Sequence, residues 1–171
     1  MSPRRSHRVV GHSVAKVDGL ALVTGGPVFC RDHLPEDCLF VGMLRSPHAH
    51  ARIRSIDTAG AEALEGVEAV VHHGNTPRVM RTTAGQGYPE PSPYDFTTFD
   101  AKVRFVGDRV AAVAARSEEL AARALGLIQV DYQPLDPVLD PRKAMDPGAP
   151  VIHDEPDARV VIPVPYQPER N

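Results

Sequence analysis

The stretch CLFVGMLRSPHAHARIRSID, Cys38 to Asp57, decides the fold class of this chain. Residues 38–46 form a short apolar run, which predicts a strand that is buried on both faces. Pro47 has no N–H to donate to a sheet and therefore interrupts that strand. Residues 50–57 alternate between polar and apolar side chains, and we interpret them as a second strand. The stretch thus predicts two strands joined through a proline-containing turn.

The segments that follow alternate between strand and helix. In chain order they are helix 59–64, strand 67–73, a long loop 74–98, strand 102–105, strand 110–115, helix 119–127 and strand 127–135. Asp57 or Thr58 precedes the first helix and Ser117 the second, as capping residues do, and Gly66 stands where a helix end needs a positive φ. The order β-β-α-β, loop, β-β-α-β predicts an α/β domain of α+β character, with a mixed sheet and a few short helices.

The two ends of the chain differ from this central region. Residues 1–16 are polar and irregular, which predicts an N-terminal arm followed by a domain over residues 17–146. Residues 147–171 are punctuated by proline and predict an extended C-terminal linker or arm. The loop 74–98 is long for a compact domain, and such loops are usually functional or ordered by a partner.

The composition argues against several classes of protein. The chain has 171 residues, 42% of them hydrophobic, and a formal net charge of −3. This length is sufficient to bury a core, and the negative charge argues against nucleic-acid binding. There is no apolar run of about 18 residues that would span a membrane. The N-terminus lacks the apolar segment of a signal peptide, so we expect a cytoplasmic protein.

Sequence motifs of catalysis are absent. The chain contains no GxxxxGK[ST], no GxGxxG and no GxSxG. Cys30 and Cys38 are too few and too widely spaced for an iron–sulfur site or a zinc ribbon, and we interpret both as thiols. The carboxylates all have structural or solvated interpretations. The residues therefore predict no catalytic, cofactor-binding or metal site, and suggest a component of something larger.

The second strand raises one question of chemistry. Its histidines and arginines, His48, His50, Arg52 and Arg54, are predicted to share one face. Two histidines are too few for a structural zinc site, which takes four ligands; a histidine-based metal carrier is an alternative. We favour a polar face covered by water or by a partner subunit.

Six segments taken together resemble one family. They are VDGLALVTGGPVF (17–29), LRSPHAHARIRSID (44–57), ALEGVEAVV (63–71), VRFVGDRVAAVAARSEELAARAL (103–125), VDYQPLDPVLD (130–140) and APVIHDEP (149–156). In this order and spacing they resemble the N-terminal α/β hammerhead domain of the molybdenum-binding subunit of the xanthine dehydrogenase and aldehyde oxidase family.

The resemblance implies an enzyme complex that hydroxylates a heterocycle or an aldehyde with oxygen from water. Such a complex carries molybdopterin-bound molybdenum, [2Fe–2S] clusters and FAD. In the family the pterin contacts and the catalytic glutamate lie beyond this domain, so none of these groups is expected on this chain. The expected partners are a catalytic molybdenum subunit, an iron–sulfur subunit and an FAD subunit, and the chain alone is expected to be inactive. A stand-alone interaction module without enzyme activity is the alternative.

One turn departs from the family pattern. Asp108-Arg109 stands where many relatives have Gln-Pro, and a turn without proline differs in stiffness. Together with the polar strand face, this turn completes the candidate partner interface, which consists of His48, His50, Arg52, Arg54, Asp108 and Arg109.

Overall fold

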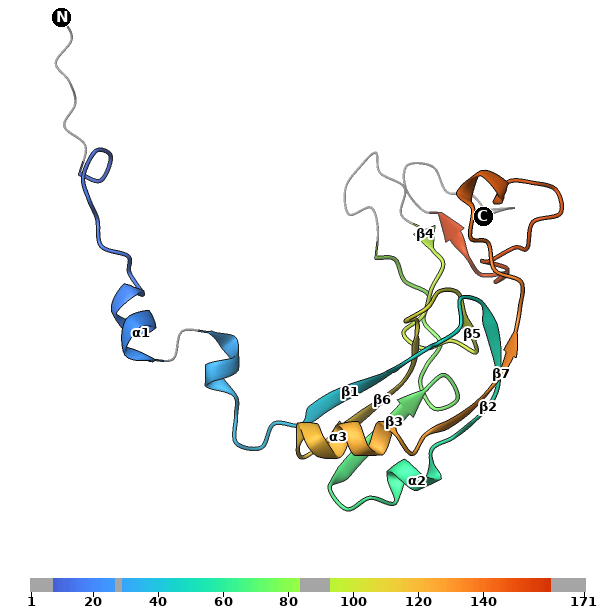
Figure 1. The fold of residues 1–171 in the computed structure, drawn as a ribbon, viewed down its shortest axis with the longest axis horizontal. Helices are drawn as coiled ribbons and strands as arrows, with labels where there is room; N and C mark the ends of the chain where they lie inside the picture. Colours follow the sequence, from blue (N-terminus) through green and yellow to red (C-terminus); the bar gives the residue numbers. More distant parts are fainter. Residues whose placement is uncertain (1–7, 27–28, 84–92, 161–171) are drawn as a thin grey trace, which may run out of the picture. The chain divides into compact units, whose positions relative to one another are not determined.

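The computed structural model of the protein describes residues 8–26, 29–83 and 93–160 (Figure 1). The chain divides into two compact units, Met1–Cys38 and Leu39–Asn171. This division lies after Cys38, whereas the sequence predicts a domain that begins at residue 17. In the described part of the chain, no helix combines the length and the apolar character needed to cross a membrane.

The described residues of the first unit include two short helical segments. They are α1, Gly19–Thr24, and η1, Cys30–His33. Gly25 ends α1 with a φ of 72°, a left-handed conformation that glycine adopts readily. Phe29 begins η1, and its backbone N–H donates to the Asp32 carboxylate at 3.0 Å.

The described residues of the second unit form two three-stranded sheets and one two-stranded sheet. The first sheet has the order β1-β6-β3, with β1 at Phe40–Arg45, β6 at Arg109–Ala115 and β3 at Val67–His72. The second has the order β5-β2-β7, with β5 at Lys102–Val103, β2 at Ala51–Asp57 and β7 at Gln129–Pro134. The helical elements of this unit are α2, Ala59–Glu62, α3, Glu118–Leu125, and η2, Pro141–Lys143.

Each sheet takes its central strand from the other half of the chain. The segment β1-β2-α2-β3 contributes β2 to the centre of the second sheet, and β5-β6-α3-β7 contributes β6 to the centre of the first. Both helices therefore connect strands of different sheets, and no crossover returns to the same sheet. The pairings of the described strands are all antiparallel, whereas a mixed sheet was expected. The predicted fold class is confirmed, and the predicted order β-β-α-β is present twice, as β1-β2-α2-β3 and β5-β6-α3-β7; the short strand β4, Pro93–Tyr94, falls inside the predicted loop 74–98.

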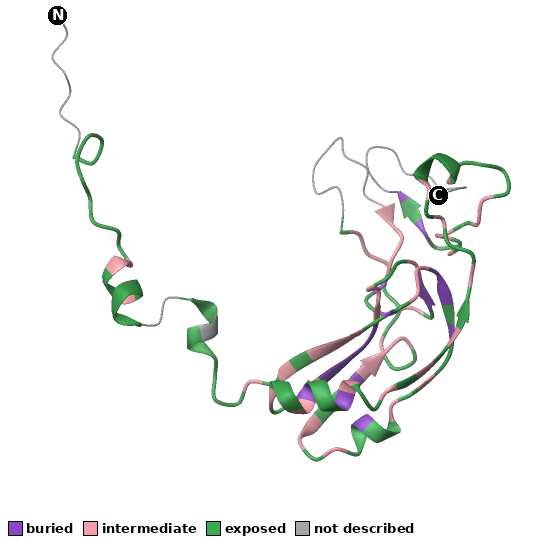
Figure 2. Ribbon diagram, in the orientation of Figure 1, coloured by how far each residue is buried: buried purple, intermediate pink, exposed green. Residues whose placement is uncertain are grey.

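The first core lies between the first sheet and its helices. It consists of Ala61, Val70, Val113, Ala115, Ala121 and Ala124, and Figure 2 shows the central strand β6 as largely buried. The predicted cap of α3 is confirmed, since the Ser117 hydroxyl accepts the N–H of Leu120 at 3.1 Å. Alanines on α3 allow the helix to approach β1 closely. A Cβ atom on Gly42 would lie 2.8 Å from Cδ1 of Leu125, so a larger residue here would require the Leu125 side chain to move.

Strand β1 is not buried on both faces, and this part of the prediction is wrong. Val41 is 67% exposed, because α3 packs on the face of β1 that carries Gly42 and leaves the face of Val41 uncovered. Periodicity alone cannot distinguish such an edge strand from a central one.

As far as the structure describes it, the C-terminal arm packs within the second unit. Its strand β8, Arg159–Val160, pairs with β4, Pro93–Tyr94, which belongs to the predicted loop 74–98. Ala158 and Val160 are 2% and 4% exposed, so the arm contributes buried apolar side chains. Residues 84–92 of the loop and 161–171 of the arm lie outside the described residues.

Candidate functional site

Two connections between the sheets meet at one corner of the second unit, which we call the crossing corner. It consists of residues 45–50, which lead from β1 to β2, and residues 103–109, which lead from β5 to β6 (Figure 1). The N–H of Ser46 donates to the carbonyl of Asp108 at 2.8 Å, and the N–H of Gly107 donates to the carbonyl of Ser46 at 2.8 Å. Backbone hydrogen bonds therefore join two of the motifs that carry the family resemblance.

Asp108 stabilises the turn of the crossing corner from within. Its carboxylate accepts the N–H of Arg104 at 3.0 Å and the N–H of Arg109 at 2.8 Å. Gly107 has a φ of 91°, which a residue without Cβ adopts at little cost. The Asp108 carboxylate is thus already used for backbone hydrogen bonds. The Arg109 guanidinium lies 5.7 Å from the centre of the Phe96 ring.

The two histidines of the predicted polar face lie in the connection, and their rings occupy different environments. His50 is 5% exposed, and its Nδ1 lies 2.7 Å from the carbonyl oxygen of Asp136. Because a carbonyl only accepts, Nδ1 carries the proton. His48 packs edge-on against the Tyr132 ring, with the ring centres 4.8 Å apart. The prediction of one shared strand face is wrong, because the chain bends at residues 47–50 and β2 begins only at Ala51.

The two arginines do follow the predicted alternation. Arg52 and Arg54 are exposed, whereas Ala51 and Ile53 are buried. Arg52 donates to the carboxylate of Asp154 on the C-terminal arm at 3.2 Å. One of the predicted interface cations therefore also holds the arm in place.

The geometry of the described residues does not fit a metal ion. They contain no group of three or more His, Cys, Asp or Glu side chains that is close enough to hold one. Cys30 is exposed and Cys38 is half-buried, and neither cysteine is in a disulfide.

Two cations and two carboxylates fasten the arm to β5, a set that the sequence analysis missed. We call Lys102, Arg104, Asp154 and Glu155 the arm clamp. Lys102 is 4% exposed, and its Nζ donates to Asp154 at 2.7 Å and to the carbonyl of Ile152 at 2.7 Å. Burial lowers the pKa of Lys102, although the hydrogen bond to Asp154 opposes this shift. Burial alone would raise the pKa of Asp154, but the hydrogen bond and charge of Lys102 outweigh it, so this pKa is lowered.

The second half of the arm clamp is an ion pair between Arg104 and Glu155, whose side chains are 7% and 8% exposed. Arg104 also reaches Asp100 at 3.3 Å. Next to this pair, Nδ1 of His153 lies 3.0 Å from the carbonyl oxygen of Asp95, and burial lowers the pKa of His153. Two sequence features could have indicated this set. Lys102 and Arg104 are two positions apart in the predicted strand 102–105, and Asp154 and Glu155 are adjacent in the arm.

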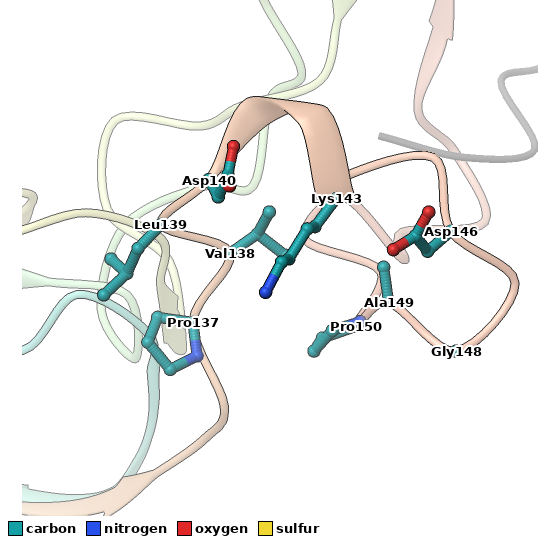
Figure 3. A pocket seen from close by; sticks show the side chains of 9 residues that line it. All are labelled: Pro137, Val138, Leu139, Asp140, Lys143, Asp146, Gly148, Ala149 and Pro150. Atoms are coloured by element: carbon teal, nitrogen blue, oxygen red, sulfur yellow. The ribbon is translucent and has the colours of Figure 1, made fainter.

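The loop after β7 encloses a pocket of about 460 Å³. Its walls come from residues 137–150, and Figure 3 shows the amino group of Lys143 extending toward the space between Pro137 and Pro150. Asp140 is engaged by Arg142, whose hydrogen bonds lower the pKa of that carboxyl group. Lys143 is exposed, so the pocket offers no buried polar group that would orient a substrate.

The chain is similar in sequence to one protein family and to several of its members. The family model described as "Aldehyde oxidase and xanthine dehydrogenase, a/b hammerhead domain" matches residues 24–136, which include both three-stranded sheets. The probable hypoxanthine oxidase XdhD of Escherichia coli K12 is 49% identical over 148 residues, which are 86% of this chain and 16% of that protein. The nicotinate dehydrogenase large molybdopterin subunit of Eubacterium barkeri is 34% identical over 151 residues, 88% of this chain and 34% of that protein.

Solved structures of related enzymes also resemble this chain. CO dehydrogenase from Oligotropha carboxidovorans matches with a TM-score of 0.70 and 37% identity over 82% of this chain and 17% of that chain. Quinoline 2-oxidoreductase from Pseudomonas putida 86 matches with a TM-score of 0.67 and 35% identity over 83% of this chain and 18% of that chain. The chain therefore spans only a minor part of the length of the relatives that it resembles.

Proposed function

The chain belongs to the aldehyde oxidase and xanthine dehydrogenase family through its hammerhead domain, and from this premise we propose that it is the non-catalytic hammerhead component of a molybdopterin-dependent hydroxylase or dehydrogenase. In this role it supports the catalytic molybdenum subunit, which hydroxylates a heterocycle or an aldehyde with oxygen from water. The observation that carries the proposal is the match of the hammerhead family model to residues 24–136, which contain both three-stranded sheets. The chain covers only 16% of the length of the hypoxanthine oxidase relative.

We place the cofactors on other chains or domains of the complex. The names of the relatives include a large molybdopterin subunit and a Cu,Mo-CO dehydrogenase, which supports a molybdenum-containing assembly. The donor set of the described residues does not fit a metal. The carboxylates of the arm clamp pair with its cations and join the arm to the rest of the domain.

The proposed partners are a catalytic molybdenum subunit, an iron–sulfur subunit and an FAD subunit, within the cytoplasm. The words "subunit" and "large chain" in the names of several relatives support an assembly of more than one polypeptide. The negative formal net charge of −3 supports proteins and not nucleic acids as partners.

Cofactor content of the purified chain and of its complex tests this proposal. The chain produced alone should be colourless, without flavin, iron or molybdenum, and without hydroxylase activity. Purified through a tag from cells that produce the whole system, it should carry a molybdenum-containing polypeptide, identified by mass spectrometry and metal analysis. A flavin or metal spectrum from the isolated chain contradicts the proposal.

A further inference from the structure

We infer that the crossing corner docks into an apolar pocket on the molybdenum-binding part of the complex, with Phe105 and Val106 as its anchors. The inference rests on the proposed function, because it names the surface through which this component meets its catalytic partner.

Two adjacent large apolar side chains project from the tip of the crossing corner. Phe105 is 58% exposed and Val106 is 65% exposed. Pro47 is also exposed, and it directly follows Ser46, which is hydrogen-bonded to both Gly107 and Asp108. Turn positions ordinarily hold polar residues or glycine, and burying a Val or Phe side chain is worth about 1.5–3 kcal/mol. Two neighbouring exposed apolar side chains at a rigid turn therefore favour this turn as the surface that a partner covers.

The tip is held in one conformation before any partner binds. The N–H of Asp108 donates to the carbonyl of Phe105 at 3.1 Å, and the Asp108 carboxylate fixes the backbone on either side of the turn. Arg45 donates from Nη1 to the carbonyl of Gly107 at 3.2 Å. A rigid turn loses little conformational entropy when it docks. Rigid aromatic anchors of this kind dominate the binding energy of many interfaces.

The shape and charge of the tip specify its partner. A concave apolar pocket would cover such a tip. The exposed Arg45 beside the tip, which donates to the carbonyl of Gly107, favours a carboxylate at the rim of that pocket. The remainder of the subunit is the expected source of the pocket, because this chain spans 16% of the hypoxanthine oxidase relative and 17% of the CO dehydrogenase chain.

The test substitutes the tip within the complete complex. In Val106→Asp, a charge enters the proposed pocket, and association with the molybdenum-containing polypeptide should weaken by about tenfold or more. Phe105→Ala should also weaken association, because it removes the aromatic anchor. Val41→Asp is the matched control, since Val41 is 67% exposed on β1 and is not part of the corner; it should leave association unchanged. Circular dichroism of each isolated variant verifies that it is folded.

The possible results distinguish failure of the docking inference from failure of the proposed function. A folded Val106→Asp chain that binds the molybdenum-containing polypeptide as the wild type does overturns the docking inference and leaves the proposed function standing. If the wild-type chain itself retains no such polypeptide, the proposed function fails, and the inference fails with it. Loss of self-association in Val106→Asp, without loss of the molybdenum-containing polypeptide, would identify a second copy as the occupant and also overturn the inference.

Discussion

Nζ of Lys102 lies 2.7 Å from Oδ1 of Asp154, although Lys102 is 4% exposed and 52 positions of sequence separate the two residues. This ion pair joins the short strand β5 to the C-terminal arm. An ammonium group this deeply buried requires its partners, because an uncompensated buried charge is costly. Lys102 therefore contributes to the coupling between the arm and the domain body, together with Arg52 and the Arg104–Glu155 pair.

Substitution of Lys102 by methionine should release the arm. Lys102→Met keeps the apolar stem but removes the donor to Asp154 and to the carbonyl of Ile152. We expect the free energy of unfolding to fall by about 1–3 kcal/mol and hydrogen–deuterium exchange over residues 151–160 to become faster. Lys143→Met is the control, since Lys143 is exposed in the loop after β7. Equal protection of the arm in both variants would show that the ion pair does not hold it.

Acidification should weaken the docked arm. Burial lowers the pKa of His153, with Asp95 opposing the shift and Arg104 and Lys102 reinforcing it. The folded state therefore binds fewer protons than the unfolded state just below the ordinary histidine pKa of about 6.5. Above that pH, protonation of His153 does not affect the free energy of unfolding. As the pH falls below it toward the lowered pKa of the folded state, the free energy of unfolding decreases. Urea unfolding at pH 7.5 and at pH 5.5 measures the loss.

His153→Gln provides the control for this pH dependence. The variant should lose part of the difference between the two pH values. Burial also lowers the pKa of His73, with His72 reinforcing that shift and Asp100 opposing it, so His73 is expected to contribute to the remaining part. A variant with the full wild-type pH dependence would rule out His153 as a contributor.

Two glycines with similar backbone angles should respond differently to alanine. Gly66 has a φ of +87° and Gly107 a φ of +91°, so both variants incur a left-handed strain of about 1–2 kcal/mol. A Cβ atom on Gly66 would also lie 2.9 Å from Leu120, whereas one on Gly107 meets nothing within 4 Å. Gly66→Ala should therefore have the lower urea midpoint. Equal midpoints would mean that Leu120 moves aside without cost.

Alanine variants of the two histidines of the crossing corner should differ in their free energy of unfolding, and neither should change zinc binding. His50→Ala removes a buried ring and the donor to Asp136, and we expect a loss of about 2 kcal/mol or more. His48→Ala removes a half-buried ring that contacts Tyr132, and should cost less. Neither variant should change the heat of titration with zinc, since the two rings occupy different environments. Stoichiometric zinc binding that both substitutions abolish would contradict this geometry.

Much of the fold could be predicted from local signals. The alternation in residues 51–54, the cap at Ser117 and the turn at Gly66 are local consequences of side-chain type, and each is confirmed. Strand direction and the exchange of central strands could not be predicted, because they depend on contacts between distant segments. The exposure of Val41 belongs to the same class, since an edge strand has the same composition as a central one.

The candidate site could be predicted only in part. Asp108 and Arg109 were identified from their departure from the family pattern, and they lie at the crossing corner. His50 was assigned to an exposed face because strict alternation was extended through a bend, whereas its ring is buried. The arm clamp was missed because Lys102 and Asp154 meet only after the arm folds back, and each taken alone resembles an ordinary surface charge.

Native mass spectrometry of the complex purified through this chain tests the central claim most directly. The account predicts a complex in which this chain is bound to a larger polypeptide that carries molybdopterin and molybdenum, and from which the Val106→Asp chain is depleted. Recovery of the wild-type chain alone, or bound only to proteins without molybdenum, from cells that contain the molybdenum-binding polypeptide would contradict the account.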